Sequence, residues 1–534
     1  MAQPSLEFHD IQGILRSGYG RLEEASFLLA RVTDLTEARN WLAAIVEDIG
    51  GEKLPYCVTH AGHLESHQRQ ALQVAFTAPG LLKLGLPPDL FPDDRFQDTP
   101  GDRAQTFSRE FYLGMASEDG EIEGRSRRLG DIGANRPSQW DWGAPGHLPD
   151  VLIMLYAEAG GLAAFRQIVT ADLALGFEVV GVLCTADATS EGKTRREPFG
   201  FVDGIGQPEI DWDARRKPGT RDDLDYSNLI APGEFLLGYK NEYGLYTDRP
   251  LLAAERDPDS ILAPAEDHPR MRDLGRNGTY LVLRHLEQDV SGFWRFVSKE
   301  SPQDEGVGLA EAMVGRRLLT GDPLITASRA AIPGVGPDAA DVRQNNFTFE
   351  SDPEGLTCPF GAHIRRANPR TADLPGGRQD FLSWLLRTLG LKHGGPRDDL
   401  ISSSRFHRII RRGRPYGPLM DRESALRGDD PGHASGIHFI ALNANISRQF
   451  EFIQNAWIVN TKFNGMDGET DPLLGNRQPF PVDHPADAFG LPQPSGPGRR
   501  IKGLPQFVTV RGGAYFFLPG LRALRFIARQ GGSV

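Results

Sequence analysis

The sequence predicts an α+β fold made of two related units, each with one antiparallel sheet and flanking helices. The first half of the chain shows the pattern strand, helix, strand twice in succession, and the second half repeats that order. This is the element order of a ferredoxin-like module, in which the helices lie on one face of the sheet. The length of 534 residues also favours two units, because a single hydrophobic core stops growing at about 250–300 residues.

The first unit is predicted from its hydrophobic periodicity. A strand pattern runs from Ser26 to Asp34, and the segment after it repeats apolar residues at about the helical period. The remaining patterns are a strand over 71–77, a strand at DVLIMLYAEA, a helix at GGLAAFRQIVTADLAL and a strand that ends at Cys184.

The second unit repeats this order from Thr279 onward. Its patterns are a strand at TYLVLRHL, a helix at VSGFWRFVSKE, a strand at GIHFIALNAN, a helix at ISRQFEFIQNAWIV and a closing strand near FVTV. The polar segment 211–228 separates the units, so we predict an N-terminal domain over residues 1–225 and a C-terminal domain over residues 226–534. The Gly- and Pro-rich segment 471–500 is predicted to be a long functional or surface loop.

The composition is that of an ordinary globular protein, with 39% hydrophobic and 24% charged residues. The net charge of −12 disfavours nucleic acid and anionic membrane as partners, because both bind basic surfaces. Three widely spaced cysteines, Cys57, Cys184 and Cys358, cannot form a disulfide framework. The start of the chain lacks the pattern of a signal peptide, and we therefore predict a cytoplasmic protein.

The segment EPFGFVDGIGQPEI, residues 197–210, places Asp203 between Val202 and Gly204. One interpretation is structural, because Asp-Gly between apolar residues is a strong hairpin signal. The other is functional: Gly200 and Gly204 would let a large flat ligand approach the backbone, and Asp203 would point at the chemistry. The segment alone does not decide between the two.

The segment CPFGAHIRRANPR, residues 358–370, contains His363 followed by Arg365, Arg366 and Arg370. One interpretation is a satisfied core or loop histidine beside a solvated basic turn. The alternative is an axial imidazole on a haem iron, with guanidinium groups near the anionic propionates, since Arg forms bidentate pairs with carboxylates.

Two later segments carry further candidates. In FHRIIRRGRPYGPLM, Arg411 is either a surface residue or an inward guanidinium that needs a buried acid or a bound anion. In QFEFIQNAW, Phe450, Ile453 and Trp457 share a helical stripe that is predicted to pack in the core, with Glu451 at its edge. Glu451 is either a helix-surface acid or a carboxylate that supports a ligating histidine.

Taken in order, these four segments resemble the dye-decolorizing peroxidases, a family of haem peroxidases. The family signature Gly-x-x-Asp-Gly is matched by residues 200–204, and the blocks CPFGAHIRRANPR, RIIRRGRPYG and QFEFIQ follow in the family's order. Further likeness at DIQGILRSGYG, LQVAFTAPGLLKLGL, PSQWDWG and GGAYFFLPGL extends the resemblance over nearly the whole chain. The family fold is a pair of ferredoxin-like modules with the haem held mainly by the second, in agreement with the element order above.

The resemblance implies a role for each matching residue. It makes His363 the proximal ligand of the iron in one haem b per chain, and Asp203 and Arg411 the distal pair. It also implies that Glu451 accepts the hydrogen bond of the His363 ring N–H. The remaining implied haem contacts are apolar distal residues, a propionate-binding arginine and a glycine beside the haem: Ile437, Phe439, Arg365 and Gly204.

The implied activity is the reduction of hydrogen peroxide, followed by one-electron oxidation of bulky organic donors such as dyes and phenolics. Asp203 would move the proton between the two peroxide oxygens while Arg411 stabilises charge on the departing oxygen. Alternatively, Arg411 carries most of the rate and Asp203 mainly orders water. Because a carboxylate keeps its charge at a lower pH than an imidazole, the sequence predicts an acidic optimum.

Two features depart from the shared pattern. The insertion TADLPGGRQDFLSWLLRTLGLKHGGPRDDLISSSRF, between His363 and Arg411, predicts the longer, cytoplasmic subgroup and leaves the access channel undefined. The final segment RALRFIARQGGSV lacks the extended hydrophobic tail by which some members are loaded into protein nanocompartments, so no such packaging is predicted. A homo-oligomer is compatible with the sequence.

Two other functions are compatible with parts of the chain. His60, His63 and His67 in HAGHLESH have the spacing of metal ligands on one helical face, but a polar surface helix is the better explanation. The second alternative is a haem-binding or iron-handling protein without major peroxidase turnover. Such a protein would not need the pair of Asp203 and Arg411.

Overall fold

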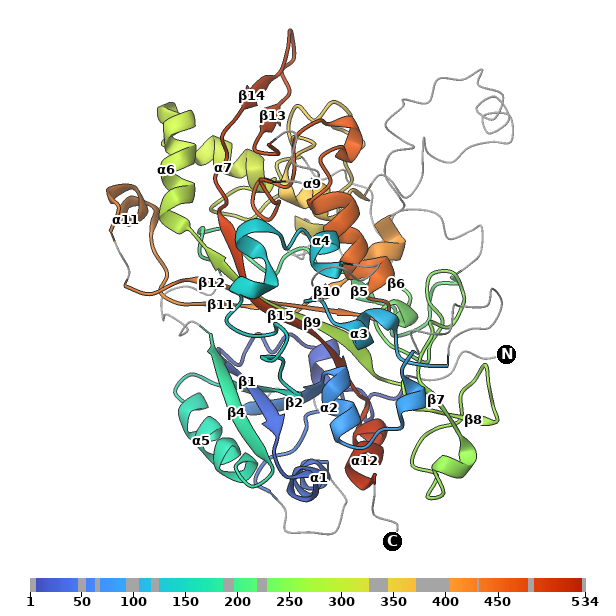
Figure 1. Cartoon of the computed structure of the whole chain (residues 1–534). Coiled ribbons are helices and arrows are strands. Elements are labelled where there is room, and N and C mark those ends of the chain that lie inside the picture. The colour runs from blue at the N-terminus through green and yellow to red at the C-terminus, as the bar shows by residue number, and fades with distance from the viewer. Residues whose placement is uncertain are drawn as a thin grey trace, which may run out of the picture.

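One antiparallel sheet joins the two halves of the chain (Figure 1). In the described residues it has nine strands, in the order β10-β12-β9-β15-β2-β3-β1-β4 with β11 paired to β12. The computed structural model describes residues 6–46, 54–62, 68–92, 105–116, 124–185, 196–218, 228–325, 344–370, 404–429, 432–478 and 485–530.

The first module contributes the strands β4-β1-β3-β2 of this order. Its strands are β1 (Glu24–Val32), β2 (Gln70–Phe76), β3 (Val151–Ala157) and β4 (Phe177–Cys184). Helix α1 (Leu35–Ala44) follows β1, and helix α5 (Leu162–Leu173) follows β3. Asp34 starts α1 where the sequence predicts, because its side chain accepts the N–H groups of Thr36 and Glu37.

The second module repeats this arrangement with the order β10-β12-β9-β15. Its strands are β9 (Thr279–Gln288), β10 (Ile410–Arg411), β11 (Arg414–Tyr416), β12 (Gly436–Asn443) and β15 (Val508–Leu518). Helix α6 (Val290–Glu300) follows β9, and π-helical turns at Ser447–Glu451 and Ile453–Ile458 follow β12. The modules meet where Phe517 of β15 pairs with Phe76 of β2.

The predicted fold class, two ferredoxin-like α+β modules, is therefore confirmed. The remaining helices and strands lie in the connections between these elements, apart from α12, which follows β15. They are α2 (Ala78–Lys83), α3 (Arg109–Leu113), α4 (Arg125–Leu129), α7 (Val307–Val314), α9 (His363–Ala367), α11 (Arg422–Arg427), α12 (Leu521–Arg529), β5 (Glu209–Ile210), β6 (Leu229–Ile230), β7 (Leu251–Ala253), β8 (Met271–Asp273), β13 (Phe489–Leu491) and β14 (Arg499–Ile501).

The core lies on both faces of the sheet. On the face that carries the helices, Phe293 and Trp294 of α6 are fully buried, and Trp41 of α1 packs against the first module. On the opposite face, Phe27 of β1 and Phe516 of β15 belong to one cluster that spans both modules. This shared cluster makes the two modules one packed body.

The predicted domain boundary at residue 225 lies in 219–227, outside the described residues, and stays a prediction. The segment with the Gly-x-x-Asp-Gly motif was assigned to the first domain, yet it packs on the second module. The rings of Phe199 and Phe293 are 4.5 Å apart, and the indole N–H of Trp294 donates to the Phe199 carbonyl. The segment that leads to Asp203 is thus positioned by α6.

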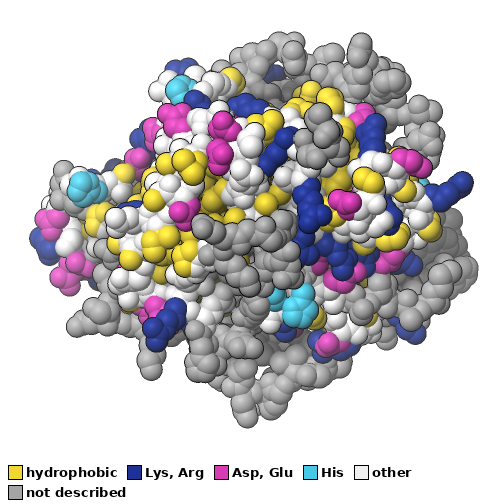
Figure 2. All heavy atoms as spheres, turned by 90° about the horizontal axis from the view of Figure 1, so that it is seen from below, with side chains coloured by type: hydrophobic (Ala, Val, Ile, Leu, Met, Phe, Trp, Pro, Cys, Tyr) yellow, Lys and Arg dark blue, Asp and Glu magenta, His cyan; other side chains and the backbone are white. Residues whose placement is uncertain are grey.

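The face of the molecule seen from below carries patches of hydrophobic side chains between charged ones (Figure 2). The exposed large hydrophobic residues of the chain include Ile168 on α5 and Val180 and Val182 on β4. Within the described residues, each helix is too short or too polar to span a lipid bilayer.

Candidate active site

Asp203 follows a tight turn that closes on Glu197. Arg196 and Val202 form an antiparallel bridge, and the N–H of Glu197 donates to the Phe201 carbonyl at 3.0 Å. The observed turn therefore spans residues 197–201 and lies just before the position predicted for the hairpin, Asp203–Gly204. The reason is the Glu197 carboxylate, which accepts the N–H groups of Phe199 and Phe201 and closes the turn there.

Gly204 has φ +83°, and a Cβ on it would meet no atom within 4 Å. The glycine is thus required by the backbone conformation, and the space beside it is open. The half-buried Asp203 accepts the N–H of Gly204 at 2.6 Å through Oδ1. Its other carboxylate oxygen has no hydrogen-bond partner in the described part of the chain, so it is available to a reacting proton.

Arg411 is brought to the same loop by two groups of hydrogen bonds. Its guanidinium Nη2 donates to the Gly206 carbonyl at 3.2 Å. The Gln207 amide bonds both backbone groups of Arg411, at 2.9 Å to the N–H and 3.1 Å to the carbonyl. The described residues show no ion pair between Asp203 and Arg411, and Arg411 is joined to the loop that carries Asp203 through Gly206 and Gln207.

Ile437 and Phe439 lie on the face of the sheet that carries Arg411. Arg411 pairs with Ala441 of β12, and directly paired residues point to the same face, as do alternate residues along a strand. Phe439 also lines a small cavity together with Phe450 and Leu474. The structure therefore brings the apolar residues predicted for the distal wall to the face of Arg411.

His363 begins the short helix α9, and its ring is fixed by a carboxylate. The ring Nδ1 lies 2.9 Å from Oδ2 of Asp471, whose side chain is completely buried. The other carboxylate oxygen of Asp471 accepts the N–H groups of Leu473 and Leu474. The second ring nitrogen, Nε2, has no hydrogen-bond partner among the described residues, and the imidazole is 23% exposed.

The predicted pairing of His363 with Glu451 is wrong. Glu451 is 1% exposed, and its carboxylate accepts two hydrogen bonds from Arg125, at 2.8 and 3.0 Å, and one from the Tyr515 hydroxyl at 2.9 Å. Asp471 was missed because sequence patterns class its segment as a loop. The only signal for it is that 471–500 was already predicted to be a functional or surface loop.

The predicted propionate contact of Arg365 is also not supported by its surroundings. Its guanidinium donates to the Asp352 carboxylate and to two main-chain carbonyls, and it stacks on the rings of Phe349 and Phe360. Arg365 therefore anchors the His363 segment to the surrounding protein. Its guanidinium is directed at Asp352 and at main-chain carbonyls, and these contacts do not favour a propionate partner.

Arg316 is a better candidate, and the sequence patterns missed it. It is 7% exposed, and its guanidinium donates to the carbonyls of Gly321 and Gln344. Burial, and then the positive charges of Arg370 and Arg411, lower the pKa of Arg316 to about 9. A buried guanidinium whose pKa is lowered by neighbouring positive charges marks a site for an anion.

These residues fit a haem better than a bare metal ion. In the described part of the chain, no three His, Cys, Asp or Glu side chains gather as they would around a metal ion. An iron held by the single imidazole of His363 would therefore need a macrocycle for its other ligands. His60 lies in an isolated strand bridge with Gln12, and His63 and His67 lie outside the described residues, as does most of the insertion after Arg370.

The chain matches no family model. It is 30% identical over 412 residues to the Multifunctional dye peroxidase DyP2 of an Amycolatopsis species, and the match covers 73% of each protein. The chain belongs to the dye-decolorizing peroxidase family. It is also 27% identical over 546 residues to the dye-decolorizing peroxidase msp1 of Mycetinis scorodonius, which covers 98% of this chain and 88% of that protein.

A solved dye-decolorizing peroxidase in complex with 2,6-dimethoxyphenol has the same fold, with a TM-score of 0.67 at 23% identity and coverage of 98% of this chain and 100% of that one. The predicted family and fold are thus confirmed, and so is the prediction of a haem-dependent oxidoreductase. The predicted subgroup, the longer cytoplasmic one, stays a prediction.

Proposed function

We propose that this dye-decolorizing peroxidase reduces hydrogen peroxide at a haem b ligated by His363 and then oxidises dyes and phenolics in one-electron steps. The observation that carries the proposal is the His363 imidazole, whose Nδ1 is held by Asp471 while Nε2 stays available to iron. One relative is named a dye peroxidase, and one solved family member is a complex with 2,6-dimethoxyphenol, which supports these donor classes.

Asp203 and Arg411 have complementary roles on the distal side. When bound, the haem supplies the redox-active iron at which the O–O bond is cleaved. Asp203 accepts the proton of the peroxide oxygen nearer the iron and returns a proton to the far oxygen, so that water leaves. The Arg411 guanidinium stabilises the negative charge that develops on the departing oxygen.

Asp471 orients His363 and raises the electron density of its ring. Burial by itself would raise the pKa of Asp471, but the charge and hydrogen bond of His363, with the Leu474 N–H, hold it below its ordinary value. An ionised acceptor keeps the proton on Nδ1 and makes Nε2 a stronger donor to iron. This interaction favours the oxidised states of the iron.

Arg316 and Arg370 are the residues we assign to the haem propionates in place of Arg365. Arg370 is 3% exposed and donates to the carbonyls of Asn345 and Phe347; the first of these bonds is 2.5 Å long. Two propionates would offset two of the three positive charges in the cluster that Arg316 and Arg370 form with Arg411. Ile437 and Phe439 would contribute the apolar distal surface.

The function is tested by peroxide-dependent oxidation of 2,6-dimethoxyphenol and of a bulky dye by the purified holoprotein. We expect turnover of both that stops without peroxide and is lost in His363→Ala. A haem-loaded protein that oxidises neither donor would favour the alternative, a haem-binding or iron-handling protein.

The cytoplasmic location is also a proposal. It rests on the three cysteines, all of which are free in the structure, as expected in a reducing compartment. We propose no nucleic acid or membrane partner, because the net charge is −12.

A further inference from the structure

Glu197 closes the turn that leads to Asp203, and all three of its hydrogen bonds come from neutral donors. Its Oε1 accepts the Phe201 N–H at 2.9 Å, and its Oε2 accepts the Phe199 N–H at 3.0 Å. The third donor is the Gln288 side-chain amide, 2.8 Å from Oε2 at the end of β9. The carboxylate therefore ties the distal turn to the sheet of the second module.

No cation compensates this carboxylate in the described part of the chain. The neighbouring Arg196 directs its guanidinium to the carbonyls of Gly200, Leu318 and Leu319. From α6 the turn receives only the Trp294 N–H, and the Asp289 carboxylate at the start of α6 accepts the Gly292 N–H. The charged group that acts on Glu197 most directly is thus Asp203, which has the same sign.

This environment raises the pKa of Glu197 to about 7. Burial is the main cause and the nearby Asp203 charge adds to it, although the three hydrogen bonds oppose the shift. Glu197 is therefore protonated in acid and ionises near neutral pH. Once ionised, it places a second negative charge behind the distal carboxylate.

We propose that Glu197 is a positioning residue for Asp203: its carboxyl group fixes the turn against β9, and its ionisation opposes the binding of anions on the distal side. The proposal rests on the proposed role of Asp203 and adds a residue that none of the sequence motifs singles out. Anion binding would then weaken at alkaline pH because Glu197 ionises, whether or not Asp203 changes its own protonation state.

The test uses ferric holoenzyme and fluoride. Hydrogen fluoride is an acid of about the strength of a carboxylic acid, so fluoride itself stays anionic between about pH 5.5 and 8.5. Fluoride affinity is measured from the haem spectrum for wild type, Glu197→Gln and the control Glu209→Gln, an exposed acid at the end of the same segment. We expect wild type and the control to lose affinity about threefold more across neutral pH than Glu197→Gln.

A second variant keeps the proposal testable if Glu197→Gln does not fold. Gln288→Leu removes a donor that favours the ionised form, so the inflection in fluoride affinity should move to higher pH. Identical pH profiles for wild type and whichever of these variants folds would overturn the proposal. A protein whose spectrum shows no haem, or no response to fluoride, would instead count against the proposed function.

Discussion

At the scale of single residues, Asp203 and Arg411 have different proposed tasks. We predict that Asp203→Asn slows the reaction of the ferric enzyme with peroxide by about 10²–10⁴-fold, the usual contribution of a positioned acid–base group. Arg411→Leu should slow it by about 10²–10³-fold through the loss of charge stabilisation. Stopped-flow absorbance measures both rates.

Glu209→Gln is the matched control, because Glu209 is exposed and belongs to the same segment. If Asp203→Asn reacted at nearly the wild-type rate while Arg411→Leu did not, Asp203 would only order water. That was the alternative left open by the sequence.

Asp471 and Glu451 are buried acids with different roles. Asp471 contacts His363, the proposed iron ligand, whereas Glu451 bonds to Arg125 and Tyr515 and supports the fold. We predict that Asp471→Asn raises the iron reduction potential by roughly 60–120 mV, the one-electron equivalent of a 10- to 100-fold effect. Glu451→Gln should leave the potential unchanged, since its partners are Arg125, Arg128 and Tyr515. A spectroelectrochemical titration that gave the reverse order would restore the pairing predicted from sequence.

The sequence identified side chains better than it identified their partners. His363, Asp203 and Arg411 stand in motifs whose order is visible in the chain. The partner of His363 depends on how the loop at Asp471 approaches α9, and that loop has no periodicity from which its path could be predicted. Arg316 was missed for the same reason, because its proximity to Arg370 and Arg411 exists only in three dimensions.

At the scale of elements, periodicity predicted the strands and helices of both modules well. The helix expected at VSGFWRFVSKE is α6 to the residue, Val290–Glu300. Periodicity did not predict two features. They are the pairing of Phe517 with Phe76 that joins the modules, and the π-helical form of Ser447–Glu451 and Ile453–Ile458. Both depend on tertiary packing, since β-pairing and helix winding leave the hydrophobic pattern nearly unchanged.

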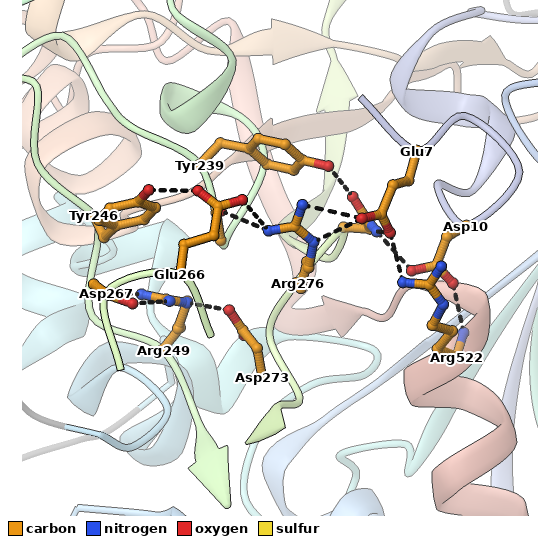
Figure 3. Close-up of polar contacts among 12 residues, drawn as sticks. Glu7, Asp10, Tyr239, Tyr246, Arg249, Glu266, Asp267, Asp273, Arg276 and Arg522 are labelled. Atoms are coloured by element: carbon orange, nitrogen blue, oxygen red, sulfur yellow. Dashed lines mark hydrogen bonds and ion pairs between the residues drawn. The ribbon is translucent and has the colours of Figure 1, made fainter. Parts of the chain in front are cut away.

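The N-terminal segment is attached to the second module by a network of ion pairs (Figure 3). Arg276 donates to Glu7 at 3.1 Å and to Glu266 at 2.8 Å, and it packs over the Tyr239 ring. Arg522 of α12 also reaches Glu7, at 2.6 Å. Arg276 is 7% exposed, and the loss of its charge would leave Glu266 without an ion pair in the described part of the chain and Glu7 with the partly exposed Arg522 alone.

We predict that Arg276→Gln lowers the free energy of unfolding by about 3 kcal/mol, because breaking one side of a buried ion-pair network leaves uncompensated charge. The control is Arg256→Gln, whose pair with Asp89 is about half exposed on both sides and should cost less than about 1 kcal/mol. Urea unfolding measures both. Equal losses would mean that the network contributes no more than a surface pair.

At the scale of the whole molecule, His438 links the two ends of the sheet. Its Nε2 lies 3.0 Å from the Cys184 carbonyl, although β12 and β4 stand near opposite ends of the strand order. The sheet must therefore curl so that β4 reaches β12. Burial, and then the charge of His285, lower the pKa of His438 from 6.5 to about 3.

This shift predicts loss of stability in acid. The unfolded chain takes up a proton at His438 near pH 6.5 and the folded chain only near pH 3, so the His438 contribution is complete above 6.5 and is lost as pH falls toward 3. His438→Gln retains an amide donor but does not titrate. We expect its unfolding free energy to fall less steeply with acid, by up to about 1.4 kcal/mol per pH unit. Parallel slopes for the two proteins would contradict the shift.

The proposed function requires that this chain hold a peroxide-reactive haem on His363. The most direct measurement is the absorption spectrum of the purified protein before and after one equivalent of hydrogen peroxide, for wild type and His363→Ala. We expect a Soret band that shifts at once on addition of peroxide in the wild type, and a band that is displaced or lost in His363→Ala. A wild-type spectrum with no Soret band, or with a band that peroxide leaves unchanged, would contradict the proposed function.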